Sequence, residues 1–162
     1  MYHSFVKSKV HSTFEQISAG QWESMVKAMA PRFTYIFYGN SALSGERHSI
    51  EAVRQWWQRS FRLMPSATFE VLDVIVSGGP WNTSIATAVA VHATLADGSS
   101  YDNVFNQFMH MQWGRVTEIR TLENTEVLQQ AMDRLAAAGY PEAHAAPITD
   151  EYRAETPTVR SE

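Results

Sequence analysis

The sequence predicts an α+β domain in which helices cover one face of a curved antiparallel sheet. Apolar residues recur at steps of three and four over 5–17, the spacing of an amphipathic helix, and capping and stop residues delimit another helix over 125–138. Between these segments, stretches rich in Val, Thr and aromatic residues alternate with Gly-containing turns, the pattern of an antiparallel meander. A chain of 162 residues suits one domain. We assign that domain to 1–140 and a C-terminal tail to 141–162.

Composition excludes several classes of site. The chain has no cysteine, so it can form neither a disulfide framework nor a thiolate zinc site, and it has no cysteine nucleophile. Thirteen basic and seventeen acidic residues give a formal charge of −4, which argues against nucleic acid as a partner. No apolar run is long enough to span a membrane and no secretory signal is readable, so we expect a cytoplasmic protein.

The first half of the chain predicts three helices and one strand. The helix over 5–17 is expected to stop at Ala19-Gly20, and a short second helix is expected to end before Pro31. The aromatic and β-branched segment 32–38 predicts a strand, followed by a loop over 39–45. Ser49 is the expected N-cap of a third helix, which carries Ile50, Val53, Trp57 and Phe61 on one stripe.

The second half predicts four strands and a last helix. The strands are expected at 68–77, 83–95, 101–111 and 115–122, with hairpin turns at Asp97-Gly98 and Trp113-Gly114. A helix over 125–138 follows, capped by Asn124 or Thr125 and ended by Gly139 and Pro141. From residue 142 the composition indicates a tail, either lying on the body or disordered.

Several short motifs occur in an order and spacing that resemble a known family. They lie at 19–23 between the first two helices, at 33–36 on the first strand, at 43–45 and 50–53 around the third helix, and at 113–120 in the last hairpin. The chain over about 5–138 resembles the SnoaL-like polyketide-cyclase group of the nuclear-transport-factor-two-like (ketosteroid-isomerase-like) superfamily. The resemblance implies a cystatin-like, cone-shaped sheet wrapped around a pocket. It leaves the reaction open, because this fold hosts isomerases, cyclases, hydrolases and binding proteins.

The register of the last hairpin decides which residues face that pocket. A three-residue loop over 112–114 would set Met111 opposite Arg115, Gln107 opposite Ile119 and Phe105 opposite Thr121. Opposed residues share a face, and the resemblance turns this one inward. A two-residue turn would shift the register by one and undo the pairing. The expected inner face is mostly apolar with a few polar groups, typical of a small-molecule pocket: Asn103, Phe105, Gln107, Met109, Met111, Ile119 and Thr121.

The resemblance also implies where catalytic groups would stand. The base of ketosteroid isomerases falls near Ile36, their protonated aspartate on Gln107 and their tyrosine near Thr13. Limonene epoxide hydrolases resemble the chain at Tyr35, but their carboxylate falls on Thr121 and their asparagine on Phe37. The usual ionisable base is therefore missing, and neutral donors and acceptors are left: Tyr35, Asn103, Gln107 and Thr121.

A base for proton transfer would then have to come from His92, His48, Asp102 or Glu123. His92 is a candidate because histidine is the residue type most often used in acid–base catalysis, although a lone strand histidine is more often a surface group. The register points Asp102 away from the pocket, and His48 precedes an N-cap. Glu123 shares the face of Thr121 but lies where helix capping competes. We expect catalytic roles for Tyr35, His92, Gln107 and Thr121, and ligand contacts from Phe37, Trp56, Asn103, Phe105, Met109, Ile119 and Glu123.

The other face of the hairpin predicts a partner. It is expected to carry Asn106, Phe108, His110, Val116, Glu118 and Arg120, and no predicted helix is available to cover it. The superfamily commonly dimerises through this face, so we expect a two-fold homodimer built on Phe108, His110, Glu118 and Arg120.

Three functions fit these observations. The chain is an enzyme acting on a small apolar oxygenated molecule without a cofactor, as an isomerase, cyclase or hydrolase. Alternatively, it is a non-catalytic binding or accessory domain, or a dimerisation module with a filled pocket. Scattered histidines without ligand spacing predict no metal site. A pocket group that titrates between about pH 5 and 8 would favour the enzyme.

Overall fold

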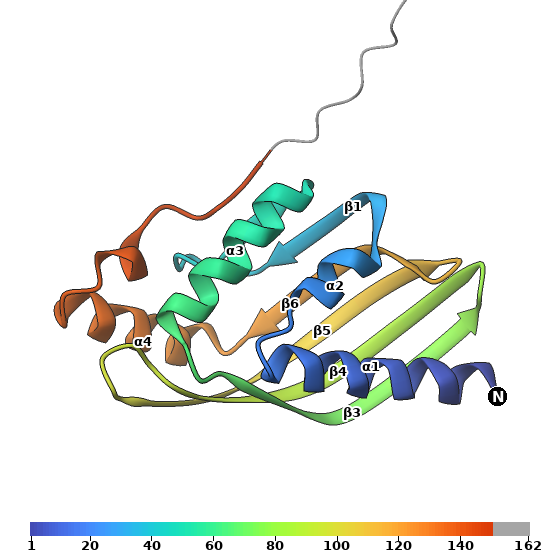
Figure 1. Cartoon of the computed structure of the whole chain (residues 1–162), viewed down its shortest axis with the longest axis horizontal. Coiled ribbons are helices and arrows are strands. Elements are labelled where there is room, and N and C mark those ends of the chain that lie inside the picture. The colour runs from blue at the N-terminus through green and yellow to red at the C-terminus, as the bar shows by residue number, and fades with distance from the viewer. Residues whose placement is uncertain (151–162) are drawn as a thin grey trace, which may run out of the picture.

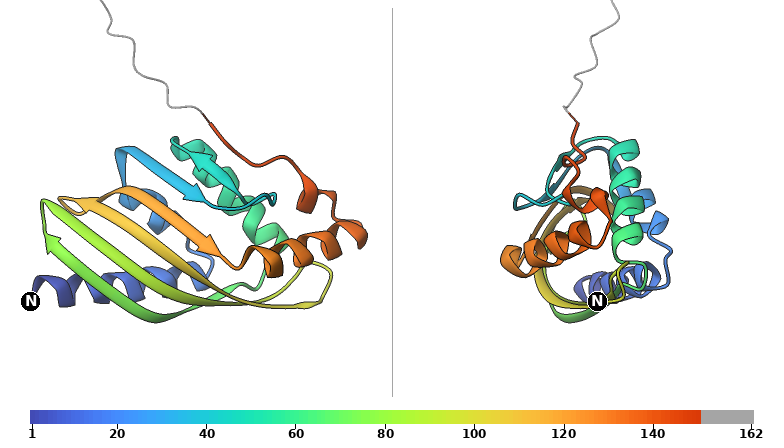
Figure 2. Two further views of the ribbon diagram at one scale, coloured as in Figure 1. Left: turned by 180° about the vertical axis from the view of Figure 1, so that it is seen from behind. Right: turned by 90° about the vertical axis from the view of Figure 1, so that its left-hand side faces the viewer.

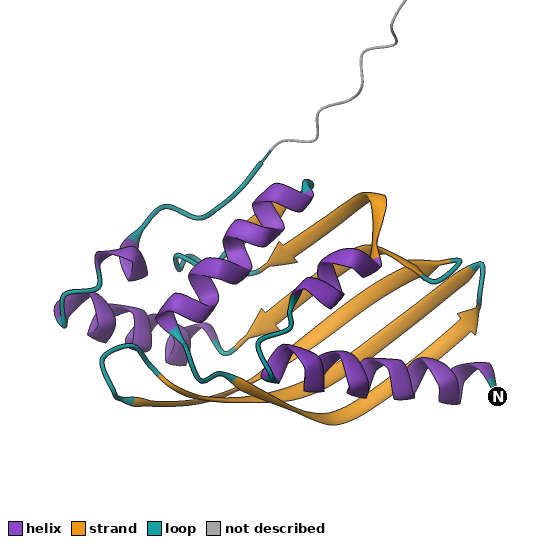
Figure 3. Ribbon diagram, viewed as in Figure 1, coloured by secondary structure: helices purple, strands orange, loops and turns teal. Residues whose placement is uncertain are grey.

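The computed structural model describes residues 1–150, in which helices pack on one face of a curved sheet, and the predicted fold class is confirmed (Figures 1 and 3). The helices are α1 (Tyr2–Ser18), α2 (Glu23–Ala28), α3 (Ile50–Leu63), α4 (Thr125–Ala137) and the short 3₁₀ helix η1 (Pro141–His144). The strands are β1 (Met29–Phe37), β2 (Gly45–Arg47), β3 (Thr68–Gly79), β4 (Asn82–Thr94), β5 (Ser100–Gln112) and β6 (Arg115–Glu123).

The sheet order is β2-β1-β6-β5-β4-β3. Neighbouring strands are antiparallel except β1 and β6, which run parallel. Figure 2 shows that the sheet curls around the helices and that the described helices leave its convex face open. The core therefore lies on the concave face, where α1 packs along β3 and the Trp22 and Trp57 rings stack at 6.5 Å.

Two predicted boundaries near β1 are wrong. Met29 is already extended, with φ −65° and ψ 143°, so α2 ends before it and β1 begins there rather than at residue 32. Pro31 lies within the strand, at the irregularity between Met29 and Thr34 where a missing N–H costs no ladder bond. The segment expected to be only a loop leads into the short strand β2, which pairs with the end of β1.

The β5–β6 hairpin has a different register from the predicted one. Its turn has two residues, Trp113 and Gly114, both with positive φ as a type I′ turn requires. The predicted loop over 112–114 is therefore wrong, as are its pairs. The observed pairs are Gln112 with Arg115, Gln107 with Thr121, Met109 with Ile119 and Phe105 with Glu123.

A β-bulge nevertheless keeps the predicted inner face. The pairing passes from Met111–Val116 to His110–Glu118, which leaves Thr117 unpaired. The turn and the bulge each shift the register by one, so the side chains return to the expected faces beyond the bulge. Val116 lies between the turn and the bulge, where only the shift from the turn applies. It is buried, so its predicted place on the outer face is wrong.

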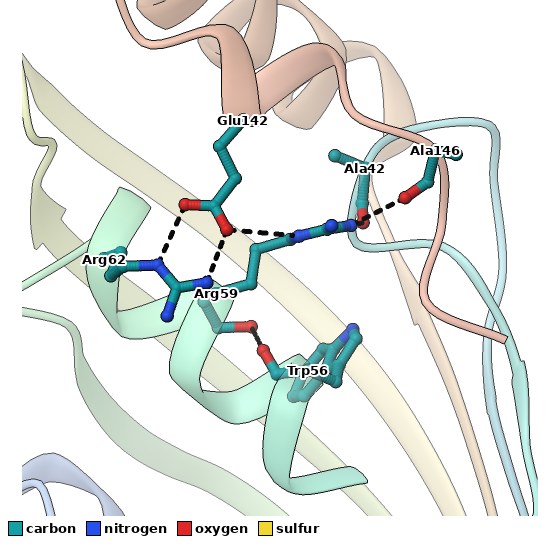
Figure 4. Close-up of polar contacts among 7 residues, drawn as sticks. Ala42, Trp56, Arg59, Arg62, Glu142 and Ala146 are labelled. Atoms are coloured by element: carbon teal, nitrogen blue, oxygen red, sulfur yellow. Dashed lines mark hydrogen bonds and ion pairs between the residues drawn. The ribbon is translucent and has the colours of Figure 1, made fainter. Parts of the chain in front are cut away.

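The C-terminal segment up to residue 150 lies against the body. Glu142 of η1 accepts hydrogen bonds from the Arg62 guanidinium of α3 at 2.9 and 2.5 Å (Figure 4). Arg59 donates to the carbonyls of Ala42 and Ala146, at 3.0 and 2.8 Å. Of the predicted tail, residues 151–162 lie outside the described part of the chain.

The α3 cap provides a test of the fold. The Ser49 hydroxyl accepts a hydrogen bond from the Ala52 N–H at 3.2 Å, as predicted. We expect Ser49→Ala to lower the free energy of unfolding by about 1 kcal/mol, because this donor would lose its partner. Urea denaturation measures the change. Ser8→Ala, at an exposed site in α1, is the control, and equal stability of the two variants would contradict the cap's role.

Candidate functional site

Most of the predicted site residues lie around one small cavity on the concave face. This inner cavity has a volume of about 60 Å³. Its polar lining comes from Tyr35 on β1, Gln107 on β5, and Thr121 and Glu123 on β6. The predicted Phe37, Trp56 and Phe105 form apolar walls. Paired strands place these residues together, because Tyr35, Gln107 and Thr121 share the inward face.

The structure leaves four predicted residues outside this lining. His92 lies on the outward face of β4, half-exposed, with its Nδ1 2.5 Å from Asp102 Oδ1. Asn103 is not part of the cavity lining, although its Nδ2 donates to the Tyr101 hydroxyl at 2.8 Å. Met109 lines a second cavity, and Ile119 is fully buried in the core. The even-numbered residues of this part of β4 face outward, so His92 does not contribute an ionisable group to the inner cavity.

Glu123 provides that group instead. It is the last residue of β6 and only 7% exposed. Helix capping does not compete for it, because the neighbouring Asn124 side chain accepts the N–H groups of Glu126 and Val127. Burial raises the pKa of the Glu123 carboxyl to about 7, although hydrogen bonds from Tyr101 and Asn103 oppose the shift. A carboxyl with this pKa exchanges protons readily at neutral pH.

Tyr101 holds the Glu123 carboxyl in place. The Tyr101 hydroxyl donates a hydrogen bond to Glu123 Oε1 and accepts one from Asn103 Nδ2 at 2.8 Å. Burial is the main reason that the Tyr101 pKa lies above its ordinary range, so the hydroxyl keeps its proton. The sequence analysis missed this residue. The alternation that singled out Asn103 also puts Tyr101 on the same face, two residues earlier.

Two buried polar atoms of cavity-lining residues lack a partner among the described residues. Gln107 donates through Nε2 to Thr121 Oγ1 at 2.9 Å, which leaves the Gln107 Oε1 acceptor free. The Trp57 Nε1 donor is also unpaired. Unpaired buried polar groups are costly, so these atoms suit a ligand or water with both a hydrogen-bond donor and an acceptor.

The Tyr35 hydroxyl is a further donor, and the buried guanidinium of Arg47 lies close to the Tyr35 ring. Burial raises the pKa of the Tyr35 hydroxyl, which makes no hydrogen bond within residues 1–150. The Arg47 guanidinium lies 5.1 Å from the Tyr35 ring centre and 5.3 Å from that of Trp56. It donates to the carbonyls of Gly45 at 3.0 Å and Ile148 at 2.8 Å. Burial lowers the Arg47 pKa to about 10, so the group stays cationic at neutral pH.

A second and larger cavity, of about 450 Å³, lies farther along the concave face beneath α1 and α2. Its lining is predominantly apolar. Within residues 1–150, no three His, Asp or Glu side chains come together as a metal site would require. No helix in this part of the chain is long and apolar enough to cross a membrane.

The pKa of Glu123 predicts how stability depends on pH. Because the folded-state pKa of about 7 exceeds the ordinary value of 4.5, burial of this group favours the folded state at low pH. That contribution disappears as the pH rises through 7. We expect the unfolding free energy of the wild type, relative to Glu123→Gln, to fall by about 3 kcal/mol between about pH 4 and pH 8. Urea denaturation at several pH values measures this difference.

The matched control is Glu70→Gln, which changes an exposed carboxyl on β3. The difference in unfolding free energy between Glu70→Gln and the wild type should stay nearly constant over the same pH range. A pH-independent difference for Glu123→Gln as well would contradict the raised pKa.

Comparisons with known proteins agree with this architecture. No sequence among the curated proteins matches the chain. The structure of PrhC from Penicillium brasilianum superposes with a TM-score of 0.69 at 17% identity, covering 83% of this chain and 92% of the other. For an NTF2-like protein of unknown function from Burkholderia pseudomallei, the TM-score is 0.68 at 15% identity, covering 77% and 95%. For a putative SnoaL-like polyketide cyclase from Jannaschia sp., the TM-score is 0.59 at 18% identity, covering 88% and 92%.

These identities show the fold alone. The family comparison goes further, because residues 10–119 match the SnoaL-like domain. The matched segment runs from α1 into β6 and includes Tyr35 and Gln107, while Thr121 and Glu123 follow just after it. The resemblance predicted from the short motifs is thereby confirmed, and the chain belongs to the SnoaL-like domain family.

Proposed function

We propose that this protein binds a small apolar oxygenated molecule on the concave face of its sheet and transfers a proton on it, as a cofactor-independent isomerase, cyclase or hydrolase. The observation that carries the proposal is the buried Glu123 carboxyl, with a pKa of about 7, in the wall of the inner cavity. General acid–base catalysis is most effective when the pKa of the catalytic group is near the working pH.

The proposed role of each polar side chain follows from whether it can donate or accept a hydrogen bond or a proton. Ionised Glu123 takes a proton from carbon next to a carbonyl and returns it to another atom of the same molecule. The Tyr35 hydroxyl donates to the carbonyl oxygen as negative charge develops there. Gln107 Oε1 accepts a hydrogen bond from a hydroxyl of the ligand. Tyr101 remains protonated and orients the carboxyl through its hydrogen bond.

A non-catalytic binding domain is the second candidate, favoured by the larger cavity of about 450 Å³, which has no carboxyl group in its described lining. Pockets for drug-sized ligands usually measure roughly 300–1,000 Å³. The similarity to the putative SnoaL-like polyketide cyclase from Jannaschia supports the enzyme hypothesis at the level of the fold. A cytoplasmic location is part of the same proposal.

A simple isomerisation tests the role of Glu123. In dec-4-en-2-one the carbon between the carbonyl and the double bond carries acidic protons. Moving one of them to the far end of the double bond gives the conjugated ketone, which absorbs in the ultraviolet. We expect the protein to accelerate this conversion with a rate that rises as the pH passes 7. Glu123→Gln should lower the rate by about 10²–10⁴-fold.

The control is Glu70→Gln, which changes an exposed carboxyl on β3 outside the lining of both cavities. It should keep the wild-type rate. A Glu123→Gln variant that is as active as the wild type would overturn the assignment of the base. A wild type that binds the ketone without isomerising it would favour the binding domain.

We also propose that two copies associate through the convex face of the sheet. Phe108 is 51% exposed there, and Val104 and Leu122 are about as exposed on the same side. The Arg120 guanidinium lies 5.8 Å from the Phe108 ring centre and pairs with Glu118 at 2.8 Å. An apolar centre beside a charged pair gives a surface that a two-fold axis could match with itself.

Sedimentation velocity at micromolar concentration tests this assembly. We expect the wild type to sediment as a dimer and Phe108→Lys as a monomer, because the substitution would bury two lysines at the interface. Phe5→Lys, at an exposed position on α1, is the control and should remain dimeric. A monomeric wild type would exclude the proposed dimer.

A further inference from the structure

The larger cavity lies directly beyond the inner one on the same face of the same strands. Along β5 the inner cavity is lined by Phe105 and Gln107, and the larger one by Met109 and Met111. Along β6 the order is Glu123 and Thr121, then Val116. Alternate residues of a strand share one face, so the two cavities follow each other along a continuous inward surface.

Phe14 of α1 and Met25 of α2 line both cavities and therefore form the wall between them. The Phe14 ring is held by the rings of Phe69 and Phe105, with centroids 6.1 Å away in each case. Met25 has an unbranched side chain with three rotatable bonds and adapts readily to new shapes. Met25 is thus the part of the wall that can move without disturbing the aromatic cluster.

Neither cavity is a complete ligand site by itself. The inner one has the unpaired polar atoms and the carboxyl, but its volume of about 60 Å³ has room for only a few waters. The larger one has an adequate volume, about 450 Å³. Three of its polar side chains are already engaged: Tyr2 bonds to Thr83 at 2.6 Å, and Thr13 and Ser24 bond to backbone carbonyls of their own segments. The other two, Lys9 and Gln16 of α1, are exposed to solvent.

We propose that the two cavities are the two ends of one binding site for an elongated, uncharged molecule with an apolar chain and an oxygenated end. The chain lies beneath α1 and α2 among Val10, Ile85, Met109, Met111 and Val116, and the oxygenated end passes Met25 to reach Gln107 and Glu123. This inference deepens the proposed function by naming the class of substrate. A ketone or hydroxyketone fits, whereas a carboxylate would meet the Glu123 carboxyl in a buried site.

The methionines allow a direct test by NMR. Protein carrying ¹³C-methyl methionine is titrated with 2-decanone, which has an apolar chain and a ketone but does not isomerise. Met109 and Met111 report on the larger cavity, Met64 on the inner one and Met25 on the wall between them. Met132, buried in α4 and lining neither cavity, is the internal control.

We expect 2-decanone to shift the signals of Met25, Met64, Met109 and Met111 along one binding curve while Met132 stays unchanged. Val116→Trp, which fills the larger cavity, should weaken binding by at least about tenfold. Ile85→Phe is a milder variant with the same expected direction, and an unshifted Met132 signal verifies that each variant is folded. Decanoate, with the same chain and a negative charge, should leave Met64 unshifted.

Two results would overturn the joined site. One is a shift of Met109 and Met111 by 2-decanone with Met64 unchanged, which would mean that the cavities are separate. The other is the absence of any shift at saturating ketone. The titration with 2-decanone measures binding to the wild type without any proton transfer, so its outcome is separate from that of the isomerisation assay for the proposed function. If binding has the expected pattern but isomerisation does not depend on Glu123, only the catalytic proposal fails.

Discussion

The hydrogen bond between the Tyr101 hydroxyl and the Glu123 carboxyl, buried where β6 ends, is the interaction on which the candidate site depends. It joins the start of β5 to the end of β6 and keeps a carboxyl at the wall of the cavity. Burial and this bond act on the pKa in opposite directions, since burial raises it and the hydrogen bond lowers it. Asn124 takes over the capping of α4, which leaves Glu123 available for proton transfer.

The β5–β6 hairpin determines which residues can join this interaction. A two-residue turn alone would have turned Gln107 and Phe105 away from the faces of Thr121 and Glu123. The unpaired Thr117 compensates for that shift, so the polar residues of both strands reach the same side of the sheet. A bulge near a functional site often redirects side chains in this way. The bulge also separates two parts of β6. Val116, between the turn and the bulge, lines the larger cavity, whereas Thr121 and Glu123, beyond the bulge, line the inner one.

Local patterns in the sequence predicted α1 to α4, β1, β3 to β6 and the Ser49 cap, because each depends on residues a few positions apart. The short elements β2 and η1 were not predicted. The residues of the inner face were also predicted, although the β5–β6 register beyond the bulge was wrong by two residues. Side chains alternate between the two faces, so a shift of two residues changes the pairs but leaves each side chain on its face. Glu123 was recognised as a candidate whose role depended on capping, and only the position of the Asn124 side chain decides that question. His92 was a candidate because of its residue type, but the pairing of β4 with β5 directs it outward to Asp102.

Tyr101 and Arg47 show what the sequence could not reveal. The partners of Tyr101 lie 2 and 22 residues away, and Arg47 is buried by a segment about 100 residues later in the chain. An arginine in a short polar stretch has the pattern of an exposed residue. Its burial follows from the packing of the C-terminal segment through Ile148, together with the rings of Tyr35 and Trp56. Contacts of this kind arise only from the assembled fold.

The central claim is that burial raises the pKa of the Glu123 carboxyl to near neutrality, against the opposing effect of the hydrogen bond from Tyr101. A ¹³C NMR titration of the glutamate side-chain carboxyls measures it directly. The account predicts one carboxyl that titrates near pH 7, disappears in Glu123→Gln, and moves to a still higher pKa in Tyr101→Phe, where the opposing hydrogen bond is lost. If the Glu123 carboxyl titrated near the ordinary glutamate pKa of 4.5, it would be an ordinary acid and the proposed proton transfer would have no base.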